Sequence, residues 1–304
     1  MVKRKSMKKK RTGCLVQTIL PGAAIVLIGL LIFFCILVYK VSYPGVSIEA
    51  VNPSQYILPY QNIEIPIDGK TAIPAWWIPG QQGAPGVILA TGYGMSRTDA
   101  LSLAAALNQM EFNLLVFDQR GSGAEPRGVS TLGMKETTDM INVIRFLKEK
   151  PESDPTKIGI WGVDVSAFAA LNAAAEFPEV QAIAVDSPFL TIADFLNYRL
   201  SEDFGIKNDI VRFICYRVFQ LFYMFDDDSK NSSLPVDALA YKSILFIKGG
   251  DRPEMADLTS AVFEKAGSRK EMFTAAPARV HTMSGEALEE YDRQIAGFFQ
   301  LNLK

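Results

Sequence analysis

The residues with the clearest chemical potential lie at 158–167, which read as an apolar strand, a sharp turn and a helix of small residues. Such a turn holds its central side chain, here Asp164, above the sheet and at the N-terminus of the following helix. Backbone N–H groups and the helix dipole stabilise negative charge at that position. We therefore expect Asp164 to be ionised and exposed, and its carboxylate to decide which reactions are possible.

The elements around this turn predict an α/β fold with a mainly parallel sheet and helices on both faces. Short apolar or alternating runs indicate strands at 62–67, 71–78, 86–91, 113–118, 157–161, 181–186, 243–248 and 271–275. Helical periodicity lies between them, at 98–110, 134–148, 166–176, 256–266 and 286–299. The first two strands favour an antiparallel pair, and the alternation that follows favours parallel strands.

The N-terminus predicts a single membrane anchor. Residues 14–39 form an apolar run, and its last 20 residues carry no charge, enough to cross a hydrocarbon core of about 30 Å. A cleaved secretory signal is the alternative, but it would have an apolar core of about 7–15 residues and a small-residue cleavage site. Seven basic residues lie in 1–13 and only Lys40 directly follows the run. This bias predicts a cytoplasmic tail at 1–13, with the domain at 40–304 outside the cytoplasm, on the cell membrane.

Composition limits the function of the remaining chain. After the first 40 residues it has 23 basic against 33 acidic side chains, so we expect no nucleic-acid binding. Its length suits one large domain. Cys215 is the only cysteine in that part, which leaves no intradomain disulfide and no metal-ligand cluster.

Seven short motifs follow one another in an order known from one superfamily. They are Trp76 to Pro79, Thr91 to Gly94, Phe117 to Gly123, the turn at Asp164, Asp186 to Phe189, Lys248 to Asp251 and Pro277 to His281. In this order and spacing the chain resembles the α/β-hydrolase superfamily, in its serine-aminopeptidase-like and acyl-hydrolase-like branch, from about residue 61 to the C-terminus. The resemblance implies an α/β-hydrolase fold, although fold alone does not establish activity.

The resemblance also implies roles for single residues. Asp164 stands where the family has its nucleophilic serine, and His281, the only histidine, stands at the general base. Asp251 falls on or near the acidic residue that orients the histidine. The loop there is one residue shorter than the family pattern, so ungapped spacing would select Arg252, and Asp257 is a weaker substitute.

The same resemblance implies an oxyanion hole made by the backbone N–H groups of Val165 and Tyr93. Thr91 replaces a histidine that the family commonly has there, and it leaves main-chain donors available. Residues from about 190 to 242 interrupt the sheet pattern and are rich in aromatic side chains, so we expect a helical lid. Its aromatic residues either pack within the lid or line an apolar pocket above Asp164.

We expect a hydrolase with an aspartate nucleophile. Asp164 would attack an electrophilic carbon to form an ester, and His281, oriented by Asp251, would activate the water that cleaves it. Haloalkane and epoxide hydrolases of the superfamily resemble this arrangement. Such dehalogenases usually have a tryptophan where this chain has Val165.

Epoxide opening would instead need donors from the lid, and the candidates are Tyr198, Tyr216 and Tyr223.

The same residues bear on two other functions. Ordinary ester or peptide hydrolysis is disfavoured, because attack by Asp164 on an acyl carbon gives a mixed anhydride and Ser166 lies too far into the helix to replace it. A non-catalytic binding module is the alternative that remains open, because the departures from the family pattern cluster in the catalytic apparatus. Either function predicts a small-molecule substrate or ligand, with no metal and no organic cofactor.

Overall fold

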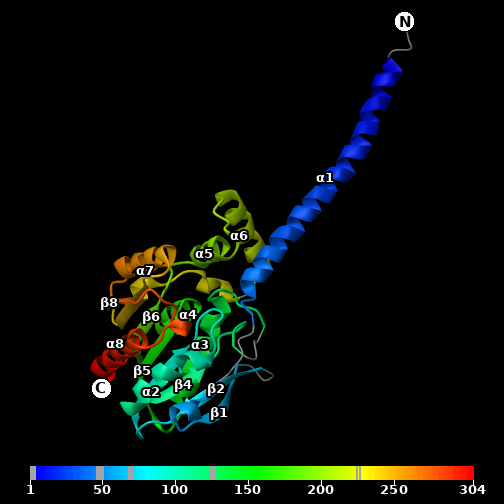
Figure 1. Ribbon diagram of the computed structural model, residues 1–304. Helices are drawn as coiled ribbons and strands as arrows, with labels where there is room; N and C mark the ends of the chain where they lie inside the picture. The colour runs from blue at the N-terminus through cyan, green and yellow to red at the C-terminus, as the bar shows by residue number, and fades with distance from the viewer. Residues whose placement is uncertain (1–4, 46–50, 68–70, 124–127, 224, 226) are drawn as a thin grey trace.

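The computed structural model describes residues 5–45, 51–67, 71–123, 128–223, 225 and 227–304. Figure 1 shows a mixed α/β body from which one long helix, α1 (Lys5–Ser42), projects. The segment Pro21–Ser42 of α1 is long and apolar enough to cross a membrane, and a signal sequence would pass the same test. The helix does not stop at the predicted boundary after residue 39, because Leu37, Val38 and Val41 are buried against the domain.

Eight strands form one sheet in the order β1-β2-β4-β3-β5-β6-β7-β8. The strands are β1 (Gln61–Pro66), β2 (Ala72–Ile78), β3 (Ala84–Ala90), β4 (Asn113–Phe117), β5 (Ser153–Val163), β6 (Val180–Asp186), β7 (Ser243–Gly249) and β8 (Arg269–Ala275). The pairs β1–β2 and β2–β4 are antiparallel, and every other neighbouring pair is parallel. The expected mainly parallel α/β sheet is confirmed.

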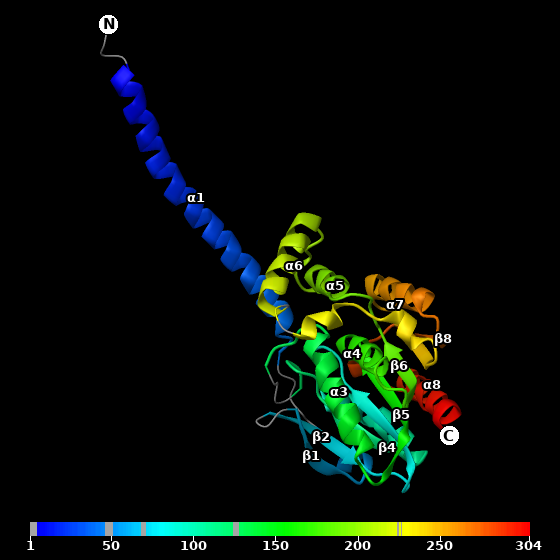
Figure 2. The same cartoon turned by 180° about the vertical axis from the view of Figure 1, so that it is seen from behind.

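Helices cover both faces of this sheet, as the opposite views of Figures 1 and 2 show. One apolar core holds α2 (Leu101–Gln109) and α8 (Glu286–Leu303) against the sheet. The other holds α3 (Met134–Lys148), α4 (Val165–Ala174) and α7 (Pro253–Lys265). Central strands such as β3 and β4 are buried throughout, because their side chains enter both cores.

The predicted lid forms two helices, α5 (Ile192–Phe204) and α6 (Asp209–Tyr223), followed by short 3-10 turns at Asp227–Ser232 and Val236–Leu239. Thr191 begins α5 as an N-cap, with its hydroxyl accepting from Asp194 N, and Gly205 ends the helix at φ +65°. Phe195 stacks on Phe189 at 4.6 Å, which fixes α5 to the domain. The helix α6 lies beside α1 in both views.

A buried carboxyl group on α8 gives a prediction about stability. Asp292 is 6% exposed and accepts a hydrogen bond from Ser102 Oγ at 2.5 Å. Burial raises the pKa of Asp292 from 3.8 to about 6. The fold therefore favours the neutral acid, and stability falls as pH rises from about 4 to about 6, by at most about 3 kcal/mol. We expect Asp292→Asn to be more stable than the wild type at pH 8 and close to it at pH 4.

The measurement is urea unfolding of the full chain in detergent at both pH values. Asp257→Asn is the matched control, because Asp257 is exposed on α7. Equal stability of Asp292→Asn and wild type at pH 8 would contradict this account of Asp292.

Candidate active site

Asp164 occupies a strained turn between β5 and α4. Its φ of +42° and ψ of −102° lie outside the regions that non-glycine residues favour. Gly162 permits the turn, because a Cβ there would lie 2.7 Å from the backbone of Ser166. The Asp164 N–H donates to Asp186 O at 2.8 Å, and its carbonyl accepts from Phe168 N at 2.9 Å. The backbone therefore fixes where the carboxylate stands.

One carboxylate oxygen of Asp164 lies between the two backbone donors named from the sequence. Oδ1 accepts from Tyr93 N at 2.8 Å and from Val165 N at 2.5 Å. A serine hydroxyl at this turn would leave both N–H groups free for a substrate oxygen. With Asp164 in place, the side chain itself fills that position and its other oxygen, Oδ2, remains for chemistry.

The expectation that Asp164 is exposed is wrong. The residue is 7% exposed, and burial raises the pKa of its carboxyl group. The N–H groups of Tyr93 and Val165 and the positive charges of Arg252 and Arg199 act in the opposite direction. The turn presents the side chain as predicted, but other segments cover it.

A small cavity of about 30 Å³ contains the Asp164 side chain. Its lining comes from the loop after β3, the end of β5, the lid and the loops after β7 and β8, and consists of Tyr93, Met95, Val163, Asp164, Arg199, Arg252, Arg279, Val280 and His281. The structure therefore brings Asp164, Tyr93 and His281 to one site. A cavity of this size has room for about one water molecule.

Three arginines line this cavity and give it a positive charge that no sequence motif indicates. Arg199, on α5, lies over the Tyr93 ring at 4.3 Å and pairs with Asp203 at 2.7 Å. Its only sequence signal is the i, i+4 pair with Asp203, which is also typical of an exposed helix face. Arg279 pairs with Glu202 at 2.7 Å.

Arg252 is the third arginine of the cavity. It occupies the position that the family motif, aligned without a gap, assigns to the acidic residue that orients the histidine. Its Nη2 donates to Ser187 Oγ at 3.0 Å. Burial lowers the pKa of Arg252, but the charges of Asp186, Tyr198 and Asp164 outweigh burial and raise it. A permanent positive charge therefore lies near the carboxylate of Asp164.

Asp251 does not line the cavity. Its Oδ1 lies 3.7 Å from Arg252 Nε, so its nearest described charge partner is that guanidinium. His281 is on the short 3-10 turn Val280–Thr282 and is exposed to solvent on one side. Asp257 lies exposed on α7. The role of Asp251 as the acidic partner of His281 stays a prediction.

The lone histidine gives a direct test of its acidic partner. Burial lowers the pKa of His281 from 6.5; among the charges, Asp99 raises it most, Arg279 and Arg252 lower it, and Asp251 raises it least. We expect NMR titration of the His281 ring to give a pKa below 6.5. That pKa should fall further in Asp99→Asn than in Asp251→Asn. A larger fall in Asp251→Asn would instead identify Asp251 as the partner.

The lid tyrosines do not meet at this cavity. Tyr198 lies on α5 and is only 2% exposed. Burial raises the pKa of its hydroxyl group, and the charge of Arg252 lowers it. Tyr216 and Tyr223 lie on α6 and do not line the cavity. Ser166 is fully buried and its hydroxyl donates to Thr91 O, so it does not face the cavity as a second nucleophile.

Within the described ranges, no group of three or more His, Cys, Asp or Glu side chains is placed to hold a metal ion. The groups that the described structure brings to the site are a carboxylate, two amide donors, three guanidinium groups and one imidazole.

Parts of this chain are similar in sequence to known proteins. A thiohydrolase from Eupenicillium brefeldianum is 34% identical over 128 residues, which are 40% of this chain and 41% of that protein. A polyketide transferase from Gibberella fujikuroi is 32% identical over 125 residues, 39% of this chain and 38% of that protein. The matched part of this chain thus spans about two fifths of the length of these relatives.

Solved structures show the same fold over a longer stretch. An esterase of Pyrococcus furiosus superposes with a TM-score of 0.65 at 20% identity, covering 87% of this chain and 99% of that one. A dienelactone hydrolase from Anabaena variabilis gives a TM-score of 0.54 at 17% identity, covering 81% and 99%. The family model for the X-Pro dipeptidyl-peptidase (S15 family) matches residues 72–300. With most of its domain inside that match, the chain belongs to the S15 peptidase family and has the α/β-hydrolase fold.

Proposed function

We propose that this protein is a hydrolase in which Asp164 forms a covalent ester with a small-molecule substrate and His281 activates the water that cleaves it. The observation that carries the proposal is the position of Asp164 Oδ1 between the N–H groups of Tyr93 and Val165. Oδ2 would attack a saturated carbon, and the bond from that carbon to its leaving group would break, with the electron pair going to the leaving group.

The two amide donors would act in the second step. Water, losing its proton to His281, would add to the carboxyl carbon of the Asp164 ester, and the carbonyl oxygen Oδ1 would gain negative charge. That oxygen already accepts from Tyr93 N and Val165 N, so the charge would develop at two preorganised donors. Breaking the ester bond would release the product as an alcohol and regenerate the carboxylate.

The same geometry opposes direct hydrolysis of esters or peptides. A substrate carbonyl oxygen cannot occupy the two N–H groups while Asp164 Oδ1 accepts from both. Relatives named thiohydrolase and polyketide transferase, and the S15 family itself, support a hydrolase-like function in general. We infer that this chain acts on an alkyl electrophile rather than on an acyl carbon.

A second function, a non-catalytic binding module, is favoured by the charges around Asp164. Arg252 and Arg199 reduce the nucleophilicity of the Asp164 carboxylate by stabilising its negative charge. Arg252 also occupies the position at which the family motif, aligned without a gap, has the acidic residue that orients the histidine. The cavity of about 30 Å³ also requires the lid to move before a substrate larger than water enters.

We further propose that α1 anchors the protein in the cell membrane, with the basic tail at 1–13 in the cytoplasm and the domain outside it. The length and composition of Pro21–Ser42 support this, as does the excess of Lys and Arg before it. Burial of Val38 and Val41 against the domain supports retention of the helix rather than cleavage, because cleavage before residue 42 would expose apolar core.

The test is turnover by the full chain in detergent micelles over epoxides, haloalkanes and activated esters. The proposal predicts turnover of at least one alkyl electrophile and little hydrolysis of the activated esters. Faster turnover of the esters would contradict it. Binding of a panel compound without turnover would favour the binding module.

A further inference from the structure

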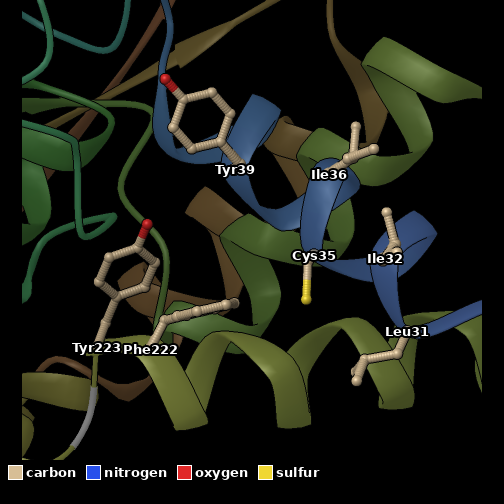
Figure 3. A pocket seen from close by; sticks show the side chains of 7 residues that line it. All are labelled: Leu31, Ile32, Cys35, Ile36, Tyr39, Phe222 and Tyr223. Carbon is tan, nitrogen blue, oxygen red and sulfur yellow. The ribbon is translucent and has the colours of Figure 1, made fainter. Parts of the chain in front are cut away.

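An apolar groove of about 500 Å³ lies outside the candidate active site, between α1 and the end of α6. It is lined by Leu31, Ile32, Cys35, Ile36, Tyr39, Phe222 and Tyr223. Figure 3 shows Leu31 and Cys35 pointing from α1 toward α6, with Phe222 and Tyr223 at the end of α6. We propose that this groove binds an acyl chain of a membrane lipid, an inference that rests on the proposed membrane anchoring by α1.

The groove has fixed walls, because the end of α1 is held by the domain. Tyr93 Oη donates to Val41 O at 2.7 Å, and Ser130 N donates to Ser42 O at 2.8 Å. Val38 and Val41 are fully buried. The spanning helix therefore does not swing freely on a linker, and α6 keeps its position beside it.

The groove lies toward the outer side of the candidate membrane span. Its lining on α1 runs from Leu31 to Tyr39, in the C-terminal half of Pro21–Ser42, and the proposed topology puts that half in the outer leaflet. Tyr39, near the end of α1, stacks on Tyr43, which directly follows the helix, with ring centroids 6.1 Å apart. Tyrosines at this level are typical of the membrane–water interface. The groove therefore faces the acyl chains of the outer leaflet and ends, at Tyr39, near the level of their head groups.

The exposed face of α6 also fits a lipid surface. Ile210, Phe213 and Leu221 are 71%, 56% and 62% exposed on this helix, whereas Cys215 and Phe219 are buried against the domain. Arg217 lies on the same exposed face, with its guanidinium 4.9 Å from the Phe213 ring. Exposed apolar side chains with a basic residue among them are typical of helices that lie in the interface. The lipid that covers α1 would thus cover the groove and α6 together.

The experiment places the full chain in vesicles of phosphatidylethanolamine and phosphatidylglycerol with a trace of phospholipid that carries a photoreactive diazirine on its acyl chain. After illumination, mass spectrometry locates the lipid adducts. We expect adducts on the peptide containing Phe222 and Tyr223, which lies outside the candidate span. Ile36→Trp, which fills the groove, should reduce them at least five-fold, whereas Ile28→Trp, at an exposed position outside the groove, should not.

Three results would overturn the groove proposal while leaving the membrane anchoring in place. Absence of adducts on α6 in protein that resists alkaline carbonate extraction would overturn the groove alone. Equal labelling in Ile36→Trp and Ile28→Trp would show that the adducts do not come from the groove. Efficient oxidative cross-linking of Cys35 between two copies, without adducts, would assign the groove to a second copy of the chain. Extraction by carbonate would instead show that the membrane anchoring on which the groove rests is wrong.

Discussion

Replacing Asp164 with asparagine is expected to reduce turnover by about 10³-fold or more while leaving the fold intact. The amide oxygen of asparagine can still accept from Tyr93 N and Val165 N, as Oδ1 does now. Its nitrogen replaces Oδ2 and is not a nucleophile, so the first bond to the substrate cannot form. The measurement is kcat/KM of the full-length variant for the alkyl electrophile that the wild type turns over.

Thermal unfolding of the Asp164→Asn variant is the control for folding. Asparagine also removes a buried charge, so the variant should unfold at the wild-type temperature or above it. Asp257→Asn, at an exposed position on α7, should leave turnover unchanged. Wild-type turnover in Asp164→Asn would exclude Asp164 as the nucleophile.

Replacing His281 with glutamine is expected to trap the reaction after its first step. The attack by Asp164 does not need a base, whereas cleavage of the ester needs His281 to take a proton from water. We expect one equivalent of leaving group to be released, followed by turnover about 10²- to 10⁴-fold slower than in the wild type. Intact mass spectrometry should then show the protein carrying the substrate moiety, on the peptide that contains Asp164.

The pH dependence of the wild type provides a second readout of His281. Burial lowers the pKa of its imidazole, so the neutral base persists below pH 6.5. Turnover should be level at neutral pH and fall as the pH drops below that pKa. A His281→Gln variant that reacts without burst and without adduct would contradict the two-step scheme.

The fold could be predicted from the sequence because strands at the centre of the sheet, such as β3 and β4, are short and strongly apolar. The predicted strand at 113–118 and the observed β4 (Asn113–Phe117) differ by one residue, and the predicted helix 134–148 is α3 as observed. Hydrophobic periodicity reports burial against a sheet, and this protein buries both faces. The turn at Asp164 could be predicted in the same way, because an apolar strand followed by a glycine and a helix of small residues is typical of such a turn.

The surroundings of Asp164 could not be predicted in the same way. Its burial depends on Tyr93 and Arg199, which come from a loop and from the lid, and no periodic pattern links such segments to the turn. Hydropathy also leaves open where the membrane anchor ends and the domain begins. Leu37 and Val38 are apolar whether they face lipid or a protein core, so hydropathy could not show that they pack on the domain.

A single gap in the motif alignment decides whether Asp251 or Arg252 is assigned to the position of the acidic residue. Allowing the gap selects Asp251, which keeps a familiar carboxylate in the catalytic set, whereas the ungapped spacing selects Arg252. The structure places Arg252 in the lining of the Asp164 cavity and Asp251 outside it. The NMR titration of the His281 ring therefore tests whether Asp99 or Asp251 has the larger effect on the pKa of the imidazole.

The most direct test of the central claim is a single-turnover reaction in water enriched in ¹⁸O, with the full chain in excess over the alkyl electrophile. If water cleaves an ester at the carboxyl carbon of Asp164, one ¹⁸O atom enters that carboxylate and the product alcohol keeps an unlabelled oxygen from the protein. We predict a mass increase of about 2 Da on the peptide containing Asp164. Label found only in the product would show that water attacks the substrate directly, and would contradict an aspartate nucleophile.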